Sequence, residues 1–292
     1  MGYDMPLWRP PSEAESLIIQ ATIGCSHNAC SFCTMYRTKR FRVRSLEEVE
    51  QDLEEFAPYA HGFRRVFLAD GDALAADSDF LLQVMAKIYQ RFPWMERITA
   101  YAGPKDIIKK SPEELRALRQ AGLTMLYLGL ESGSEAILRQ MHKGATPADM
   151  VEAARKAKEA GIDLSVTIIL GLGGRDRWEE HARETAKVLN QMDPPYLGAL
   201  TLMVPPDTPL ARRVERGEFQ VPGPLEIARE LRLLIAGLSL TNCIFRTNHA
   251  SNYLLLGATL KKDGRAQAEL LKRLDQVIAA GGAFRPEGWR GL

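Results

Sequence analysis

The sequence has few cysteines, no excess of either charge and no long apolar run. Four cysteines in 292 residues are too few for the disulfide framework of a small secreted protein. A net charge of +1 gives no electrostatic footprint for nucleic acid or a membrane surface. No apolar run is long enough to span a membrane, and the first residues lack the pattern of a signal peptide. These absences predict a cytoplasmic protein with neither a membrane nor a clear nucleic acid as partner.

A group of three cysteines is what the chain does contain. Cys25, Cys30 and Cys33 fall within nine positions. Three thiolates are one short of the usual set for a four-iron cluster, so one iron would remain for a substrate or cosubstrate. A zinc site that also uses His27 is the alternative, but structural zinc usually takes two separated ligand pairs, and no second pair exists here. The pattern therefore favours a [4Fe-4S] cluster.

The spacing of these cysteines resembles the motif of the radical S-adenosylmethionine (radical SAM) superfamily. The common motif there is C-x3-C-x2-C, with an aromatic residue just before the last cysteine. This chain has C-x4-C-x2-C, with Phe32 in the aromatic position. The extra residue weakens the assignment to a subfamily more than it weakens the assignment of a cluster. The segment from Leu128 to Ser134 further resembles the branch with coproporphyrinogen-oxidase-like and cobalamin-type members.

Short apolar runs alternate with helical patterns along the chain. Strands are predicted at residues 16–23, 65–69, 97–102, 124–130, 164–170 and 196–203. Helix starts are clearest at Ser45, with Glu48 at the capping-box position, and at Ser111-Pro112. This alternation predicts an α/β fold with a parallel sheet. The resemblance implies that the six strands form a partial (β/α)6 barrel.

We expect the chain to consist of a core domain and a C-terminal extension that fold together. Residues 1–204 are predicted to form the radical SAM core domain, and residues 205–292 a C-terminal extension packed on it as a single structural unit. In the extension the pattern predicts an irregular stretch, a helix near 225–238, a loop and a helix near 266–280. This helical and loop region is expected to cover one face of the sheet.

The second strand ends in the first candidates for binding the cosubstrate. The cosubstrate implied by the resemblance is S-adenosylmethionine. The resemblance assigns the binding of its amino group to Asp70, Gly71 and Asp72, which directly follow this strand. Glycine lets the backbone approach a ligand closely, and a carboxylate suits an ammonium group. An ordinary Asp-Gly turn is the alternative.

The fourth strand is followed by a second group of candidates. Glu131 is expected to accept from the ribose hydroxyls, with Ser132 beside it. Ser132 or Ser134 would otherwise only cap the next helix, as such residues usually do. The resemblance places the cosubstrate carboxylate at Lys143, for which a solvated lysine at a helix end is the alternative.

The fifth strand and the cysteine segment supply the remaining candidates. Ser165, Thr167 and Ile169 share one face of the strand, and the resemblance gives Thr167 a ribose contact. Gly171 would let the edge of the adenine meet the backbone. Phe32 would lean on the adenine ring or simply pack in the core.

The resemblance also implies an activity. In the superfamily a reduced [4Fe-4S] cluster cleaves S-adenosyl-L-methionine to methionine and a 5′-deoxyadenosyl radical, which removes hydrogen from a substrate. The cofactor supplies the difficult step, and the protein orients the groups and excludes water. An oxygen-labile cluster suits a reducing, anaerobic cytoplasm and an oxidoreductase. The alternatives are a non-catalytic binding protein, such as a cofactor chaperone, and a zinc-binding structural protein.

The sequence identifies the residues that bind the substrate less clearly than those that bind the cofactors. Arg246 and His249 lie in a polar run at residues 243–253 that would bind a polar substrate, act as acid or base, or form a hydrogen-bonded turn. Cys243 is a candidate fourth ligand or a buried thiol. An anionic small-molecule substrate would be attracted by a basic run, unless that run is only a solvated face: Arg37, Lys39, Arg40, Arg42 and Arg44. The expected partners are this substrate and an electron donor such as flavodoxin or ferredoxin.

Overall fold

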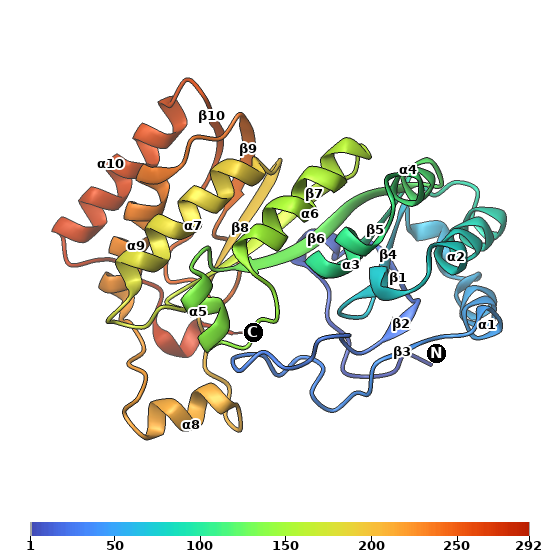
Figure 1. The fold of residues 1–292 in the computed structure, drawn as a ribbon, viewed down its shortest axis with the longest axis horizontal. Coiled ribbons are helices and arrows are strands. Elements are labelled where there is room, and N and C mark those ends of the chain that lie inside the picture. The colour runs from blue at the N-terminus through green and yellow to red at the C-terminus, as the bar shows by residue number, and fades with distance from the viewer. Residues whose placement is uncertain (1, 292) are drawn as a thin grey trace. The chain divides into compact units, whose positions relative to one another are not determined.

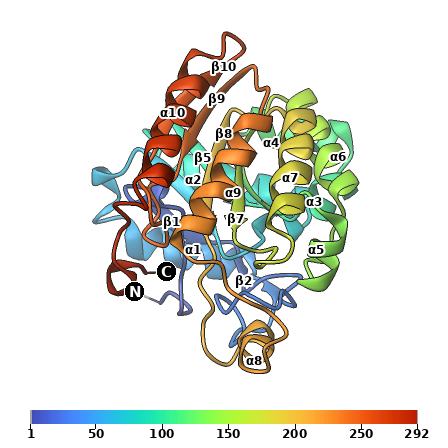
Figure 2. The ribbon, with the colours of Figure 1, turned by 90° about the vertical axis from the view of Figure 1, so that its left-hand side faces the viewer.

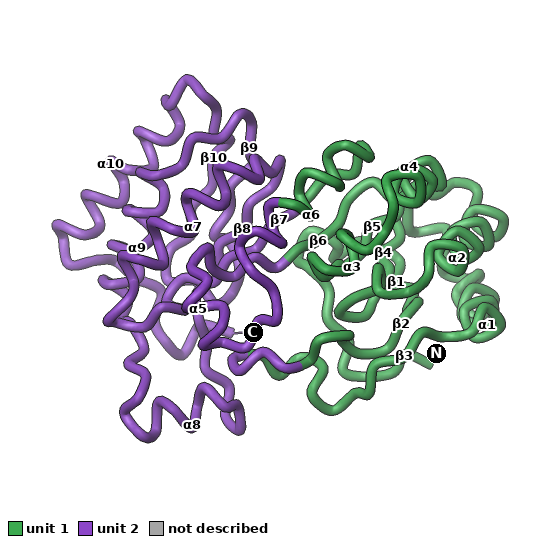
Figure 3. The backbone as a smooth tube through the Cα atoms, in the orientation of Figure 1, with its two compact units in different colours: residues 1–28, 33–128, 152–164 green, residues 29–32, 129–151, 165–292 purple. Residues whose placement is uncertain are grey.

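Strands alternate with helices along much of the computed structural model, which describes residues 2–291 (Figure 1). The chain forms two units (Figure 3). The first comprises residues 1–28, 33–128 and 152–164, and the second residues 29–32, 129–151 and 165–292. Three elements pass from one unit into the other: β6 (Leu123–Glu131), α6 (Pro147–Glu159) and β7 (Asp163–Leu170). This division follows compactness, so the predicted boundary after residue 204 stays a prediction.

The first unit contains a parallel sheet with the strand order β1-β4-β5-β6. Its strands and the helices between them lie close to the predicted positions: β1 (Leu17–Gln20), α1 (Leu46–Phe56), β4 (Arg65–Ala69), α2 (Ser78–Arg91), β5 (Arg97–Tyr101) and α4 (Pro112–Gln120). A short helix that the sequence did not predict, α3 (Pro104–Lys109), begins at a proline in its first turn.

The first predicted strand is interrupted at Ala21. Its end forms a separate strand, β2 (Thr22–Ile23), which pairs antiparallel with β3 (Arg42–Val43). The segment between β2 and β3 contains all three clustered cysteines. The cysteine segment is therefore closed at its base by a short two-stranded ribbon.

Two helices of the first unit begin where their caps predicted. The Ser45 side chain accepts from the backbone N–H of Glu48, whose carboxylate accepts from the backbone of Ser45. Ser111 and Glu114 form the same reciprocal pair ahead of α4. Each capping box satisfies two backbone donors that a helix start would otherwise leave unpaired.

The second unit continues with parallel strands and ends with an antiparallel one. The strand order is β7-β8-β9-β10, and β10 runs antiparallel to β9. The remaining elements of the unit are α5 (Glu135–Gln140), α7 (Trp178–Met192), β8 (Tyr196–Thr201), α8 (Pro209–Glu215), α9 (Pro224–Gly237), β9 (Asn242–Arg246), β10 (Gly257–Lys261) and α10 (Arg265–Ala279). Helix α9 packs beside both α7 and α10 (Figure 2).

The prediction of a loop between the last two helices is wrong, because β9 and β10 lie there. Each of these strands has only five residues, and both carry exposed polar side chains or glycine. The turn-forming residues around them obscured the alternation that identifies a strand. A second difference is α8, a helix within the stretch expected to be irregular.

Short 3-10 helices complete the described chain: η1 (Pro11–Glu13), η2 (Ala60–Gly62), η3 (Ala73–Ala75) and η4 (Glu287–Trp289). No helix within residues 2–291 has the length and apolar character needed to cross a membrane.

A buried ion pair fixes the cysteine segment to the end of β4. The carboxylate of Asp70 is inaccessible to solvent and accepts from Lys39 Nζ at 2.7 Å. It also accepts from the backbone N–H of Gly24 at 3.0 Å and from Gln20 Nε2 at 3.3 Å. A buried carboxylate needs such partners because burial removes its hydration. Asp70 thus links both ends of the cysteine segment to the sheet.

Replacing Lys39 by methionine is expected to lower the free energy of unfolding by about 3 kcal/mol, because the Asp70 carboxylate then stays buried without its counter-ion. Urea denaturation of the cluster-free protein measures this loss. The matched control is Lys262→Met, which changes an exposed lysine. Equal stability of the two variants would contradict the role assigned to this ion pair.

Candidate active site

The cysteine segment is shaped by contacts within the first unit. Asn28 adopts a left-handed backbone conformation with φ of 42°. Its side-chain amide donates to the carbonyls of Tyr36 at 2.8 Å and Lys39 at 3.3 Å. Cys25 and Cys33 are both partly exposed. Asn28 therefore closes the segment on itself and leaves two sulfur donors accessible.

The middle cysteine lies in a short piece of chain that belongs to the second unit. Beside Cys30, the backbone N–H of Ser31 donates to the Met141 carbonyl at 2.9 Å, and the Ser31 carbonyl accepts from Leu210 N–H at 3.1 Å. Phe32 packs against an apolar cluster formed by Ile137, Met141, Leu172, Leu202, Leu210 and Phe219. Core packing of Phe32 is thus observed, and its contact with adenine stays a prediction.

The donor set fits a cluster that takes three protein thiolates. Cys25, Cys30 and Cys33 are all partly exposed. Cys243 is buried in β9, where burial raises the pKa of its thiol to about 12, so that it stays protonated. Within residues 2–291 no three His, Cys, Asp or Glu side chains are arranged to hold a single metal ion. The thiolates of a four-iron cluster bind different irons, so they need not converge on one point.

The three residues after β4 have different roles. Asp70 holds the cysteine segment through its ion pair with Lys39. Gly71 must lack a side chain, because a Cβ there would lie 2.6 Å from Tyr36 Cε2 and 3.1 Å from Cys25 Cβ. Asp72 is buried and accepts from the Ser26 hydroxyl and from Gly103 N–H. Of the two predicted carboxylates, Asp72 is the one not committed to an ion pair with lysine.

The carboxylate of Asp72 is held in an unusual electrostatic environment. Burial and the negative charge of Asp106 raise its pKa to about 7. The Gly103 backbone brings the two acids together, since a Cβ on Gly103 would lie 2.8 Å from an oxygen of each. A cationic group bound there would replace the proton. Asp106 was not identified from the sequence; the only signal was its place just after β5.

After β6, two predicted residues contact each other. Glu131 Oε1 accepts from Lys143 Nζ at 2.9 Å, and both side chains are largely buried. The pair lies over Gly129, where a Cβ would be 2.0 Å from Glu131 Oε1 and 3.0 Å from Lys143 Nζ. Gly129 is therefore a residue that the sequence analysis missed. Its absence of a side chain makes room for the pair.

The two serines that follow have local partners. Ser134 accepts from Ile137 N–H and caps α5, as one alternative predicted. Ser132 is fully buried, and its hydroxyl oxygen accepts from Ser134 N–H at 3.1 Å. Ser132 thus supports the turn, and a contact with the cosubstrate stays a prediction.

A buried histidine–glutamate pair holds the ends of β6 and β7. Glu230 on α9 accepts from Gly171 N–H at 2.9 and 3.1 Å and lies 2.7 Å from His181 Nδ1. His181 Nε2 lies 3.2 Å from the carbonyl of Glu131. Both ring nitrogens of His181 therefore have a hydrogen-bond partner within the second unit. Gly171 N–H is consequently engaged by Glu230 rather than free for adenine.

His181 and Glu230 were missed by the sequence analysis. The available signal was a glutamate within the apolar stripe of α9, between Ile227 and Leu231. Charged residues are rarely buried unless they are paired. An acid on an apolar helix face therefore predicts a partner, but not its identity.

Strand register places a polar row across β7, β8 and β9. Thr167 lies opposite Gly198, and Gly198 lies opposite Arg246. The predicted common face of Ser165, Thr167 and Ile169 is confirmed, because the residues between them are buried and these are half-buried. A Cβ on Gly198 would meet nothing within 4 Å, so the row contains open space between Thr167 and Arg246.

Arg246 and His249 have different surroundings. The exposed guanidinium of Arg246 donates to the carbonyl of Phe245, and no carboxylate in the described chain pairs with it. His249 Nδ1 accepts from Ser251 N–H, and burial lowers the pKa of its ring. Ser251 in turn accepts from Thr201 N–H at the end of β8. A hydrogen-bonded turn at His249 is thus observed, and acid–base roles for His249 and Arg246 stay predictions.

Much of the basic run is already neutralised. Lys39 pairs with Asp70, Arg42 with Glu48, and Arg44 with Asp52. Arg37 donates to the Cys33 carbonyl at 2.6 Å, and Arg40 is exposed. This run therefore serves the structure of the cysteine segment more than it forms an anion-attracting surface.

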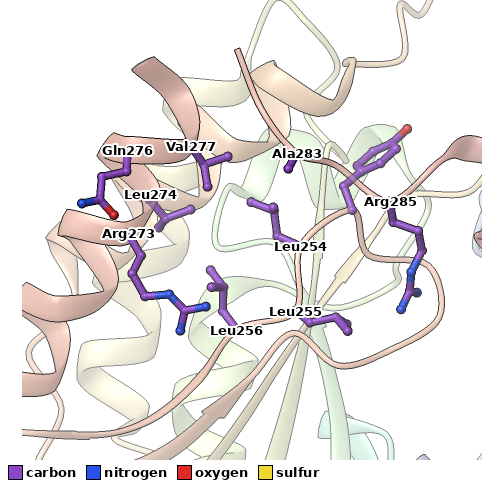
Figure 4. A pocket seen from close by; sticks show the side chains of 10 residues that line it. Leu254, Leu255, Leu256, Arg273, Leu274, Gln276, Val277, Ala283 and Arg285 are labelled. Carbon is purple, nitrogen blue, oxygen red and sulfur yellow. The ribbon is translucent and has the colours of Figure 1, made fainter. Parts of the chain in front are cut away.

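The second unit also has an apolar hollow of about 420 Å³ beside α10 (Figure 4). None of the predicted site residues lines it. Its walls are formed by Tyr253, Leu254, Leu255, Leu256, Arg273, Leu274, Gln276, Val277, Ala283 and Arg285. The hollow is thus separate from the residues at the strand ends.

Curated relatives match well over half of this chain. An uncharacterized methyltransferase from Pyrococcus horikoshii is 25% identical over 186 residues, which are 61% of this chain and 38% of that protein. The tRNA-2-methylthio-N(6)-dimethylallyladenosine synthase of Aquifex aeolicus is 25% identical over 237 residues, 78% of this chain and 52% of that protein. The chain thus spans about half, or less, of the length of these relatives.

Solved structures share the fold. Coproporphyrinogen III oxidase from Escherichia coli superposes with a TM-score of 0.60 at 17% identity and covers 95% of this chain and 71% of its own. The methyltransferase TsrM from Kitasatospora setae gives a TM-score of 0.57 at 21% identity, over 69% of this chain and 37% of its own. These similarities confirm the predicted α/β fold of the partial-barrel type.

The family itself is identified by a sequence model. The Radical SAM superfamily model matches residues 19–186, which include the three clustered cysteines and the ends of β4, β6 and β7. A [4Fe-4S] cluster, which the cysteines predicted, and S-adenosylmethionine, which the resemblance implied, are the cofactors of that family. The chain belongs to the radical SAM superfamily.

Proposed function

We propose that this protein is a radical SAM enzyme that acts on an anionic small molecule. The observation that carries the proposal is the set of three accessible thiols, Cys25, Cys30 and Cys33, in a chain that matches the family. The bound cluster would supply the electron that cleaves S-adenosylmethionine to methionine and a 5′-deoxyadenosyl radical. Every other task falls to the chain's own residues.

Asp72 is the group we assign to the ammonium of the cosubstrate. Its carboxylate lies beside Ser26 in the cysteine segment and next to Asp106. The buried Asp72 and the partly buried Asp106 beside it favour a shared proton, and an ammonium group would take the place of that proton. The Ser26 hydroxyl and Gly103 N–H orient the carboxylate in either state.

Glu131 and Lys143 are assigned to the ribose and the carboxylate of the cosubstrate. In the ligand-free protein they neutralise each other at 2.9 Å. Each would exchange this partner for a ligand group: Lys143 would pair with the cosubstrate carboxylate, and Glu131 would accept from the ribose hydroxyls. The His181–Glu230 pair holds the Glu131 backbone and Gly171 in place, and acts as a positioning element.

The substrate is assigned to the row that ends at Arg246. A guanidinium without a carboxylate partner, beside the space over Gly198, suits a carboxylate or phosphate group. Cytoplasmic location and reduction by a flavodoxin or ferredoxin complete the proposal. The named tRNA and methyl-transfer activities are those of the relatives, and only the shared radical chemistry is proposed for this chain.

Cys30→Ala is expected to abolish formation of 5′-deoxyadenosine, because two thiolates leave the cluster incompletely held. The protein is reconstituted anaerobically and chemically reduced in the presence of S-adenosylmethionine. The 5′-deoxyadenosine that forms is measured by chromatography. Cys243→Ala is the matched control and should keep the activity. A native protein that holds its cluster and never cleaves the cosubstrate would instead support a chaperone, and a colourless zinc-loaded protein would support a structural role.

Binding of S-adenosylmethionine should weaken as the pH falls below 7. The ammonium group needs the ionised form of Asp72, whose pKa is raised to about 7. One pH unit below that pKa only about a tenth of the sites are ionised, so affinity should fall about tenfold. The free energy of unfolding depends on pH in the opposite direction. The raised pKa of Asp72 favours the protonated folded state, so the stability of the fold falls as the pH rises from about 4 to 7.

Asp106→Asn tests the cause of this dependence. Removing the neighbouring negative charge should lower the pKa of Asp72 and keep affinity high at pH 6. Equilibrium dialysis of the cosubstrate against the reconstituted protein measures the profile, with Asp79→Asn on exposed α2 as the control. Identical profiles for native protein and Asp106→Asn would show that Asp72 does not bind the ammonium.

Arg246→Gln should remove the response to anionic substrates. A small-molecule extract separated by anion exchange is added to the native enzyme, and fractions that stimulate 5′-deoxyadenosine formation are identified. We expect a retained, anionic fraction to stimulate the native enzyme, and Arg246→Gln to lose at least tenfold of that stimulation while it keeps its basal rate. Arg229→Gln on α9 is the control. Stimulation by an unretained, neutral fraction would count against an anionic substrate.

A further inference from the structure

The hydroxyl of Tyr36 is buried and makes no hydrogen bond. The residue is only 4% exposed, and its oxygen has no partner within the described chain. Buried polar groups in native proteins almost always have a partner, so an unpaired hydroxyl indicates that a group outside the polypeptide supplies one. A bound ligand or ion can do so.

The Tyr36 ring is packed against the cysteine segment. Tyr36 Cε2 and Cys25 Cβ approach the same point above Gly71, at 2.6 and 3.1 Å from where a Cβ of Gly71 would lie. Lys39 Nζ lies 5.7 Å from the ring centroid. The ring is thus next to a predicted cluster ligand, and the glycine at the end of β4 provides its space.

The backbone of Tyr36 is held as firmly as its ring. Its carbonyl accepts from Asn28 Nδ2 at 2.8 Å and from Lys39 N–H at 3.0 Å. The nearest buried acid, Asp70, accepts from Lys39, Gly24 and Gln20 and makes no hydrogen bond with the phenol. The hydroxyl therefore has a fixed position near the cysteines, and the protein offers it no acceptor there.

We propose that the Tyr36 hydroxyl donates a hydrogen bond to a sulfur of the bound cluster, either the thiolate of Cys25 or Cys33 or a sulfide that they surround. The inference rests on the proposed function, since it requires the cluster. Thiolate and sulfide are acceptors, and a neutral donor aimed at them stabilises the more negative, reduced state. Hydrogen bonds to the sulfurs are among the factors that set the potential of such clusters.

Tyr36→Phe tests this role by the reduction potential, because it removes only the hydroxyl. A redox titration of the reconstituted protein, followed by electron paramagnetic resonance without S-adenosylmethionine, should show a shift to more negative potential. Iron and sulfide content should be unchanged. In the cluster-free protein the thermal midpoint should not fall, because the lost hydroxyl has no partner there.

Tyr127→Phe is the matched control, since this hydroxyl is buried and bonded to Glu13 at 2.5 Å. It should lower the thermal midpoint of the cluster-free protein and leave the potential unchanged, the reverse of Tyr36→Phe. An unchanged reduction potential in Tyr36→Phe would overturn the inference. It would do so even if that variant lost thermal stability or bound the cosubstrate more weakly. A native protein without any cluster would contradict the proposed function as well.

Discussion

A buried carboxyl group must find hydrogen-bond partners, and in each unit that requirement fixes a loop of the candidate site. In the first unit the acid is Asp70, which draws in Lys39 and the backbone of Gly24 from the two sides of the cysteine segment. In the second it is Glu230, which holds Gly171 and His181. Loops built in this way keep their shape before any cofactor binds, so that little ordering is left for the ligand to impose.

Two kinds of residue therefore share the strand ends. Asp70 and Glu230 are satisfied within the protein and hold loops in place. Asp72, with its raised pKa, and the Glu131–Lys143 pair are satisfied by one another or by a proton, which a ligand can replace. This difference in partners separates the structural acids from those proposed to bind the cosubstrate, although all of them lie near the ends of strands.

Local signals in the sequence predicted most of the fold and part of the site. The capping boxes at Ser45 and Ser111 and the apolar runs located the helices and six strands, since these depend on residues near one another in sequence. The strands β9 and β10 were missed because their five residues lack a clear alternation. A pairing such as that of His181 with Glu230 joins residues 49 positions apart in sequence, so no local pattern could reveal it. Asp70 was predicted as a ligand contact from its position, and only the structure shows its lysine partner.

We infer that three thiolates hold a cluster with one iron left open to the cosubstrate. Mössbauer spectroscopy of protein reconstituted anaerobically with isotopically labelled iron tests it most directly. We expect the spectrum to change on addition of S-adenosylmethionine at one iron of the four, the site without a cysteine. A spectrum of four irons that the cosubstrate leaves unaltered, or a protein that binds no iron at all, would contradict the account.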